Sequence, residues 1–229
     1  MRTPHSQGAF RERIVVGEAQ CEPVGDTVSL GEAAVCDPLS VALHAVPQAG
    51  SLTGKRVLVT GSGPIGALVI AAARYAGALE VVATDLHDAA LKKAAEMGAT
   101  RTVNVSQAPG LGADEFTADK GYFDVAIECT GAAPVIKDIL PALRPRGALV
   151  QVGVTGEVAI PINAIVGKEI RIIGAFRFHG EYALAARLIK EGRINVKPII
   201  TASLPFERAV EAFQMAADRK AHMKVQLTF

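Results

Sequence analysis

Short apolar runs alternate along most of this 229-residue chain with longer segments in which apolar side chains recur every three or four positions. The short runs are rich in valine and isoleucine, which is typical of parallel strands buried on both faces. They predict strands at RVLVT, EVVATD, TRTVNV, FDVAIECTG, GALVQVGV, EIRIIGAF and MKVQLTF.

The longer segments between these runs predict helices. They are residues 65–76, HDAALKKAAEMG, APVIKDILPAL, EYALAARLIKEG and PFERAVEAFQMAADR. Strands that alternate with helices of about 10–15 residues form βαβ units on a parallel sheet. We therefore expect an α/β fold built on a doubly wound, Rossmann-type sheet.

The residues ahead of the first run carry a less regular pattern. Ile14–Val16 predicts a short strand, followed by a loop. Ser29 and Glu32 have the spacing of a capping box, in which each side chain satisfies an unpaired amide of the first helical turn. The segment PLSVALHAVPQAG then predicts a helix that stops near Pro47 and Gly50.

Three glycines at G-x-G-x-x-G spacing join RVLVT to the next helix. Gly61 permits a tight turn, Gly63 lets a pyrophosphate approach the backbone, and Gly66 lets helix and strand pack closely. The free amides at the helix start would then face the phosphates. A strand-to-helix turn without a ligand is the alternative. The predicted turn comprises Gly61, Ser62, Gly63, Pro64, Ile65 and Gly66.

An acidic residue supports the nucleotide interpretation. Asp85 ends the next run about 20 positions after Gly66, where dinucleotide-binding folds place an acid against the adenosine ribose. Its carboxylate would repel a 2′-phosphate, and Leu86, His87 and Asp88 follow it without an arginine or lysine. We therefore expect NAD rather than NADP as the cofactor. A helix N-cap or a solvated loop acid is the alternative for Asp85.

Loops after the later runs lie where open α/β sheets bind ligands. Glycine in these loops would let the backbone approach a nicotinamide ring, and ordinary turn glycine is the alternative. The predicted cofactor contacts in these loops are Thr130, Gly131, Val152, Gly153, Val154 and Phe176.

Composition excludes several function classes. The formal net charge of +1 gives no bulk attraction to nucleic acid or to an anionic membrane. No charge-free apolar stretch of about 18 residues predicts a membrane span, and the N-terminus lacks the apolar core of a signal peptide. The three scattered cysteines do not form a disulfide framework. We therefore expect a cytoplasmic protein.

Five segments occur in an order that a known family shares: DPLSVALHAV, GKRVLVTGSGPIGALVIAAARYAGA, VVATDLHDAALKKAAEMGA, FDVAIECTGA and GAFRF. They resemble the medium-chain, zinc-dependent alcohol and polyol dehydrogenases. Within that family, three segments are most similar to the L-idonate 5-dehydrogenases: MRTPHSQGAFRERIVV, FRFHGEYALAARLI and INVKPIITASLPFERAVEAFQMAADRKAHMKVQL. Sorbitol and threonine dehydrogenases are close relatives.

The resemblance implies a GroES-like, β-rich catalytic domain that carries zinc and a Rossmann domain that binds NAD. We expect residues 41–180 to form the Rossmann domain, and residues 1–40 and 181–229 to be remnants of the catalytic domain. The family's Gly-His-Glu motif and its cysteine cluster do not occur in this sequence. The chain is therefore expected to lack the N-terminal zinc-binding part, with Met1 at an internal position of the family.

One metal position of the family is altered here. The family's Glu-Pro-Leu-Ser, whose glutamate lies beside zinc, is Asp-Pro-Leu-Ser starting at Asp37. Aspartate is one methylene shorter, and zinc takes about four ligands. We therefore expect Asp37, even with Cys36 beside it, to hold zinc poorly. A helix-start acid and a buried thiol are the alternatives.

Arg177 matches the family's Phe-Arg loop, in which the arginine faces the substrate. A guanidinium there could pair with the carboxylate of a sugar acid, and a surface arginine is the alternative. His44 lies within an apolar helix and is expected to be a packed histidine.

Two functions follow from the resemblance. The first is NAD-dependent oxidation of a secondary hydroxyl in a sugar acid or polyol, such as L-idonate to 5-ketogluconate, or a sorbitol- or threonine-dehydrogenase-like activity. The second is a catalytically inactive NAD-binding fragment without a zinc site. Family members pair through the last strands of the Rossmann sheet, which the resemblance places at EIRIIGAF and the preceding AIPINAIVGK. An exposed apolar edge strand invites such pairing, so we expect a homodimer.

Overall fold

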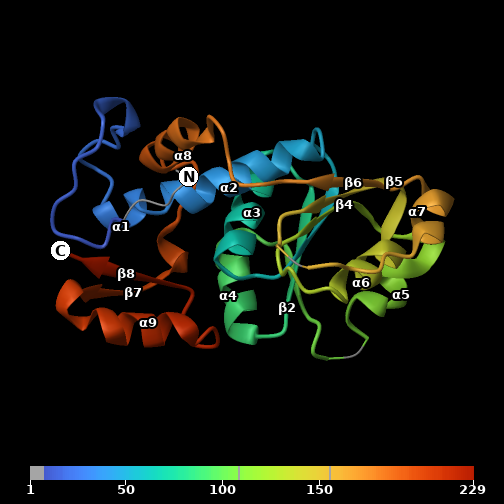
Figure 1. Ribbon diagram of the computed structural model, residues 1–229. Helices are drawn as coiled ribbons and strands as arrows, with labels where there is room; N and C mark the ends of the chain where they lie inside the picture. The colour runs from blue at the N-terminus through green and yellow to red at the C-terminus, as the bar shows by residue number, and fades with distance from the viewer. Residues whose placement is uncertain (1–7, 108, 155) are drawn as a thin grey trace.

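A six-stranded parallel sheet forms the centre of the molecule (Figure 1). The computed structural model describes residues 8–107, 109–154 and 156–229. The strand order β3-β2-β1-β4-β5-β6 confirms the predicted Rossmann-type fold. The strands are β1 Arg56–Thr60, β2 Glu80–Asp85, β3 Arg101–Asn104, β4 Phe123–Glu128, β5 Leu143–Gln151 and β6 Arg171–Gly174.

Helices fill the connections between strands, and the spacing of apolar residues predicted most of them. They are α1 Leu30–Ala33, α2 Cys36–Gln48, α3 Pro64–Tyr75, α4 Asp88–Glu96, α5 Asp114–Thr117, α6 Val135–Ala142, α7 Ile162–Lys168, α8 Glu181–Lys190 and α9 Ala209–Ala217. Short 3₁₀ turns lie at Glu18–Gln20, Gly110–Gly112, Ala118–Lys120, Lys197–Ile199 and Phe206–Arg208. Within the described ranges, no helix combines the length and the apolar character needed to cross a bilayer.

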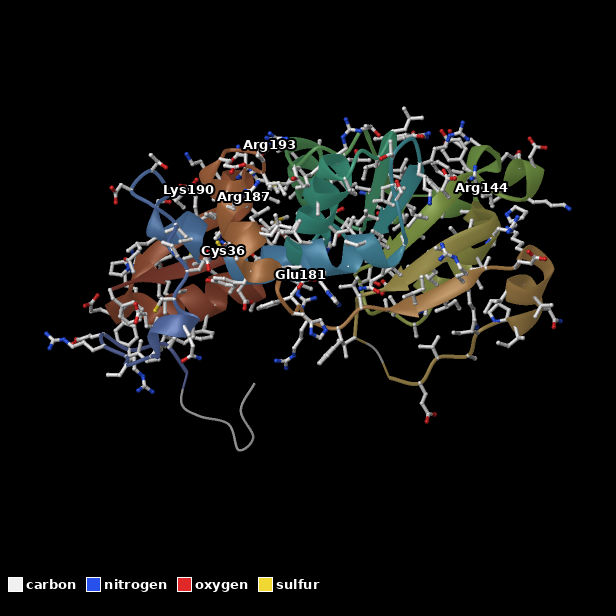
Figure 2. The ribbon with its side chains drawn as sticks, turned by 90° about the horizontal axis from the view of Figure 1, so that it is seen from above. Cys36, Arg144, Glu181, Arg187, Lys190 and Arg193 are labelled. Carbon is white, nitrogen blue, oxygen red and sulfur yellow. The ribbon has the colours of Figure 1, made fainter. Side chains whose placement is uncertain are left out.

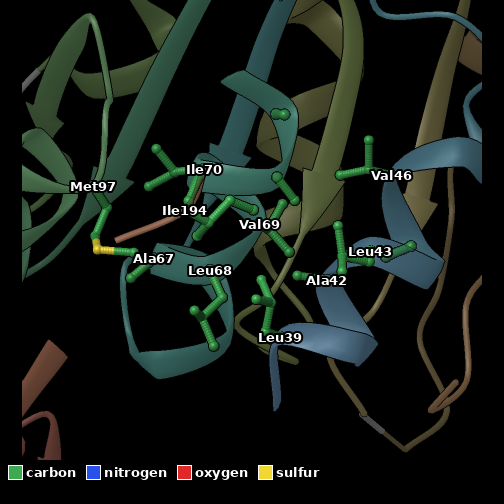
Figure 3. Close-up of a cluster of buried hydrophobic side chains, with 14 of the residues drawn as sticks. Leu39, Ala42, Leu43, Val46, Ala67, Leu68, Val69, Ile70, Met97 and Ile194 are labelled. Carbon is green, nitrogen blue, oxygen red and sulfur yellow. The ribbon is translucent and has the colours of Figure 1, made fainter. Parts of the chain in front are cut away.

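Two hydrophobic clusters pack on opposite faces of the sheet. The first contains Val57 and Val59 of β1 together with apolar residues of α2, α3 and α8. Figure 3 shows part of it, where Leu39 of α2 faces Leu68 of α3. The second contains Leu58 of β1 together with apolar residues of α6 and Phe116 of α5. Because successive strand side chains point to opposite faces and both faces are covered, β1 is apolar at successive positions.

The N-terminal helices begin where the capping pattern predicted. Ser29 is the N-cap of α1: the Glu32 N–H donates to its hydroxyl at 3.3 Å, and the Ser29 N–H donates to the Glu32 carboxylate at 3.2 Å. His44 of α2 is packed as expected, with its Nδ1 2.9 Å from Oε1 of Glu181. This contact joins α2 to the start of α8, where Figure 2 labels Glu181.

A second, two-stranded parallel sheet lies beyond α8, on the far side of the molecule from α5–α7 in Figure 1. β7 Ile200–Pro205 pairs with β8 Lys224–Thr228, and α9 connects them. The last apolar run predicted β8, whereas β7 was missed. Only Leu204 of β7 is buried, so the strand lacks the continuous apolar signal of the central sheet.

Two expected strands are wrong. Ile14–Val16 has no regular secondary structure: Val15 is 99% exposed, and no strand in the described part of the chain pairs with this segment. Most of AIPINAIVGK forms α7 rather than an edge strand. Its residues Ala164 and Ile165 pack against the second hydrophobic cluster, which holds the segment close to the sheet as a helix.

Candidate functional site

The glycine turn lies between β1 and α3, at the carboxyl edge of the sheet. Gly61 has a φ of +81°, a conformation that favours glycine. A methyl group at Gly66 would lie 1.7 Å from the Gly61 carbonyl oxygen, so only glycine allows this close approach. Gly63 is the N-cap of α3, and a methyl group there would meet nothing within 4 Å. The three glycines therefore provide a tight turn, close packing and an open approach to the helix N-terminus.

Asp85 braces this turn from the end of β2. Its carboxylate accepts the Ser62 N–H at 2.8 Å and the His87 N–H at 3.0 Å. Helix α4 takes His87 as its N-cap, so the helix-capping alternative for Asp85 is wrong. Ser62 itself is fully buried beneath the turn, and its hydroxyl donates to the Thr84 carbonyl at 3.2 Å.

A groove of about 1,020 Å³ runs along the turn. This volume suits a ligand of cofactor size. One wall contains five of the predicted residues: Gly61, Gly63, Pro64, Ile65 and Gly66. Asp85 lies on the same wall. Thr201 and the turn Arg219–Met223, which follows α9, also line the groove. The groove therefore lies between the central sheet and the C-terminal unit.

Arg219, Lys220 and His222 add basic side chains to the lining of the groove, and they were not predicted from the sequence. Nδ1 of His222 is buried and has no hydrogen-bond partner among the described residues. The sequence signal, RKAH, lies far along the chain from the glycine turn. Only the return of the chain through β7, α9 and β8 brings it to the groove.

A smaller hollow of about 320 Å³ adjoins the groove and shares Ile65, Cys129 and Thr130 with it. The loops after β4, β5 and β6 meet there, as expected for parallel strands that end at one edge. The predicted residues that line it are Ile65, Thr130, Val152, Gly153, Val154, Phe176 and Arg177. Gly131 lies directly behind this lining, where a methyl group would be 2.5 Å from the Val154 carbonyl oxygen.

Arg177 lies at the rim of the smaller hollow. Its backbone has a φ of +57°, which is uncommon for a residue other than glycine. Its guanidinium lies 5.1 Å from the centre of the Phe176 ring, within the range of a cation–π contact. The side chain is exposed, so a charged ligand group could reach it.

Glu128 is a site residue that the sequence analysis missed. It ends β4, is fully buried, and accepts the Thr130 N–H at 2.6 Å and the Gln151 side-chain amide at 2.6 Å. The signal was present as an acid at the end of an otherwise apolar strand, FDVAIE. Burial first, and then the charge of Glu128, raise the pKa of the neighbouring Cys129 thiol. Cys129 therefore lines the site as a neutral thiol.

The residues present do not fit a zinc ion. Asp37 is exposed in the first turn of α2, and Cys36 beside it is fully buried. Burial raises the pKa of the Cys36 thiol, which disfavours the thiolate that zinc requires. In residues 8–107, 109–154 and 156–229, no three histidine, cysteine, aspartate or glutamate side chains form a group that could hold a metal ion.

Comparisons with known proteins agree on one family. A family model described as zinc-binding dehydrogenase matches residues 64–191. L-idonate 5-dehydrogenase (NAD(P)(+)) from Escherichia coli K12 is 39% identical over 100% of this chain and 66% of its own length. Sorbitol dehydrogenase from Gallus gallus is 36% identical over 93% of this chain and 61% of its own length.

A solved structure shares nearly the whole fold. The crystal structure of L-idonate 5-dehydrogenase from Escherichia coli K-12 superposes with a TM-score of 0.95 at 39% identity, covering 100% of this chain and 66% of the other. The chain thus spans 61–66% of the length of the relatives described here.

Replacing Gly66 by alanine should destabilise the fold much more than the same change at Gly63. The Gly66 methyl group would clash with the Gly61 carbonyl oxygen, and overpacking of this kind costs at least about 1–3 kcal/mol. Gly63 has a φ of −68° and free space around it, so alanine fits. Urea unfolding followed by circular dichroism measures both variants. A Gly66→Ala variant as stable as the Gly63→Ala variant would contradict the close contact.

Proposed function

Because this chain belongs to the zinc-binding dehydrogenase family, we propose that its glycine turn and the adjoining groove bind the dinucleotide NAD. The observation that carries the proposal is the turn itself: Gly66 packs against Gly61, Asp85 accepts the Ser62 N–H, and the start of α3 lines a cofactor-sized groove. Family membership alone would not supply this geometry.

Each part of the groove has a separate role in the proposal. The backbone N–H groups of Ile65 and Gly66, which follow Pro64, receive the pyrophosphate, and the helix dipole of α3 favours its negative charge. Asp85 accepts hydrogen bonds from the adenosine ribose. The loops at Thr130, Gly153 and Phe176 enclose the nicotinamide end. When bound, NAD supplies the hydride acceptor for the oxidation of an alcohol.

We propose that the activity of the whole protein is oxidation of a secondary hydroxyl in a sugar acid or polyol. Support comes from the relatives, whose names refer to L-idonate and sorbitol. L-idonate is the favoured substrate, because Arg177 at the rim of the smaller hollow could pair with a carboxylate. In this arrangement Arg177 orients the acid.

A second candidate is a dinucleotide-binding protein that does not catalyse oxidation. The observation that favours it is the shortage of zinc ligands. Asp37 is exposed, Cys36 is held as a thiol, and the described residues offer no third ligand near them. Zinc therefore takes no part in the steps that we assign to these residues. The two candidates share the NAD groove and differ only in turnover.

NAD should bind the purified chain, and NADP should bind at least about tenfold more weakly, because a 2′-phosphate would approach the Asp85 carboxylate. Isothermal titration calorimetry measures both affinities. The matched control is Gly63→Asp, which adds a good N-cap to α3 but puts a carboxylate where the pyrophosphate would bind. Equal affinity for NADP would remove the role of Asp85, and unchanged NAD binding by the Gly63→Asp variant would remove the role of the turn.

The chain alone should show no zinc-dependent turnover, because the described residues supply no complete ligand set. The assay incubates the protein with zinc, NAD and either L-idonate, sorbitol or threonine, and follows the absorbance of NADH. Formation of NADH should not exceed that of the Gly63→Asp variant. Clear turnover above this control would instead favour the enzyme over the non-catalytic binding protein.

A homodimer paired through β6 is the third part of the proposal. β6 is the last strand of the central sheet, and Val166 of the neighbouring α7 is 70% exposed. Light scattering should give twice the monomer mass, and Val166→Asp should yield monomers. Val210→Asp on α9 changes a residue of similar exposure, 75%, and should leave the dimer intact. A wild-type monomer would refute the pairing.

A further inference from the structure

Glu128 carries a fully buried carboxylate whose partners are all neutral. Its Oε1 accepts the Thr130 N–H at 2.6 Å and also the Thr130 hydroxyl. The Gly131 N–H lies 3.1 Å from Oε2, and the Gln151 side-chain amide donates to Oε2 at 2.6 Å. None of the ion pairs formed by the described residues involves Glu128. Burying a carboxylate without a cation is costly, so these hydrogen bonds must offset its desolvation.

The donors come from two different loops. Thr130 and Gly131 follow β4, whereas Gln151 ends β5. Gln151 uses the same side-chain amide to donate to the Gly153 carbonyl at 2.7 Å, so one carboxylate fixes both loops. The fit is close: a methyl group at Gly153 would lie 2.5 Å from Oε2 of Glu128 and 2.2 Å from the Gly131 nitrogen.

These two loops line the smaller hollow, where Thr130 and Gly153 lie beside Phe176. We propose that Glu128 is a positioning residue for the nicotinamide end of the cofactor. It holds the loops in the shape that receives the nicotinamide, so that affinity for the whole dinucleotide depends on it more than affinity for the adenosine half. This inference rests on the proposed NAD groove.

Asp124 provides a matched control on the same strand. It lies near the amino end of β4, is 8% exposed, accepts the Arg56 N–H at 2.8 Å, and pairs with Arg144 at 2.5 Å. Glu128 lies at the carboxyl end of that strand, beside the hollow. Figure 2 shows Arg144 toward the end of the molecule remote from Cys36. Asp124 is therefore a buried acid of β4 with a structural role only.

The experiment compares Glu128→Gln and Asp124→Asn in the full chain by calorimetry with NAD and with ADP. Glutamine replaces one acceptor oxygen by an NH₂ group, which faces N–H donors. We expect Glu128→Gln to weaken NAD binding by about tenfold or more and ADP binding by less than about threefold. Asp124→Asn should lower the unfolding temperature but leave the ratio of the two affinities unchanged.

Hydrogen exchange of the ligand-free protein gives a second readout. The amides of residues 129–131 and 152–154 should exchange faster in Glu128→Gln and normally in Asp124→Asn. Equal weakening of NAD and ADP, or unchanged exchange in both loops, would overturn the positioning role. The two proposals can fail separately. If the wild-type chain does not bind NAD but both loops still exchange faster in Glu128→Gln than in the wild type, the proposed cofactor groove is refuted and the link between the loops stands.

If Glu128→Gln does not fold, Gln151→Met tests the same bridge. It removes the amide that joins Glu128 to Gly153 and keeps a side chain of similar length. NAD binding should again weaken more than ADP binding, and faster exchange should appear at residues 152–154. An unchanged affinity ratio in this variant would overturn the proposal.

Discussion

The close approach of Gly66 to the Gly61 carbonyl oxygen is the contact on which the rest of the groove depends. It brings α3 against the end of β1 and places the start of the helix at the groove. The same turn presents the Ser62 N–H to Asp85, which couples the end of β2 to the end of β1. Because parallel strands end at one edge, the loops after β4, β5 and β6 must then gather beside this turn.

The site is predictable from sequence where its determinants are local. The three glycines of the turn lie within six residues, and Asp85 follows at the end of the next strand. A single βαβ unit therefore contains the whole sequence pattern that predicts a dinucleotide site. The loops at Thr130, Gly153 and Phe176 were found because a strand pattern locates its own carboxyl end. The predicted cofactor and substrate roles of these residues stay predictions, as do the proposed domain boundaries.

The remaining features depend on contacts that local patterns do not report. The residues around RKAH do not indicate that Arg219 and Lys220 line the same groove as the glycine turn. They reach it only because β7, α9 and β8 fold back toward the central sheet. β7 was not predicted, because a strand with one buried side chain has little apolar signal in the sequence. Ile14–Val16 shows the converse: an apolar triplet predicts a strand, but a strand also needs a partner to pair with.

The alternation of side chains along β1 has a consequence for how the chain folds. Val57 and Val59 belong to one hydrophobic cluster, and Leu58 between them belongs to the other. β4 is divided in the same way, with Val125 and Ile127 in the first cluster and Ala126 in the second. Neither cluster can unfold without disrupting the strands that support the other. The central sheet and both helical layers should therefore unfold as one cooperative unit, with no layer persisting as a separate intermediate.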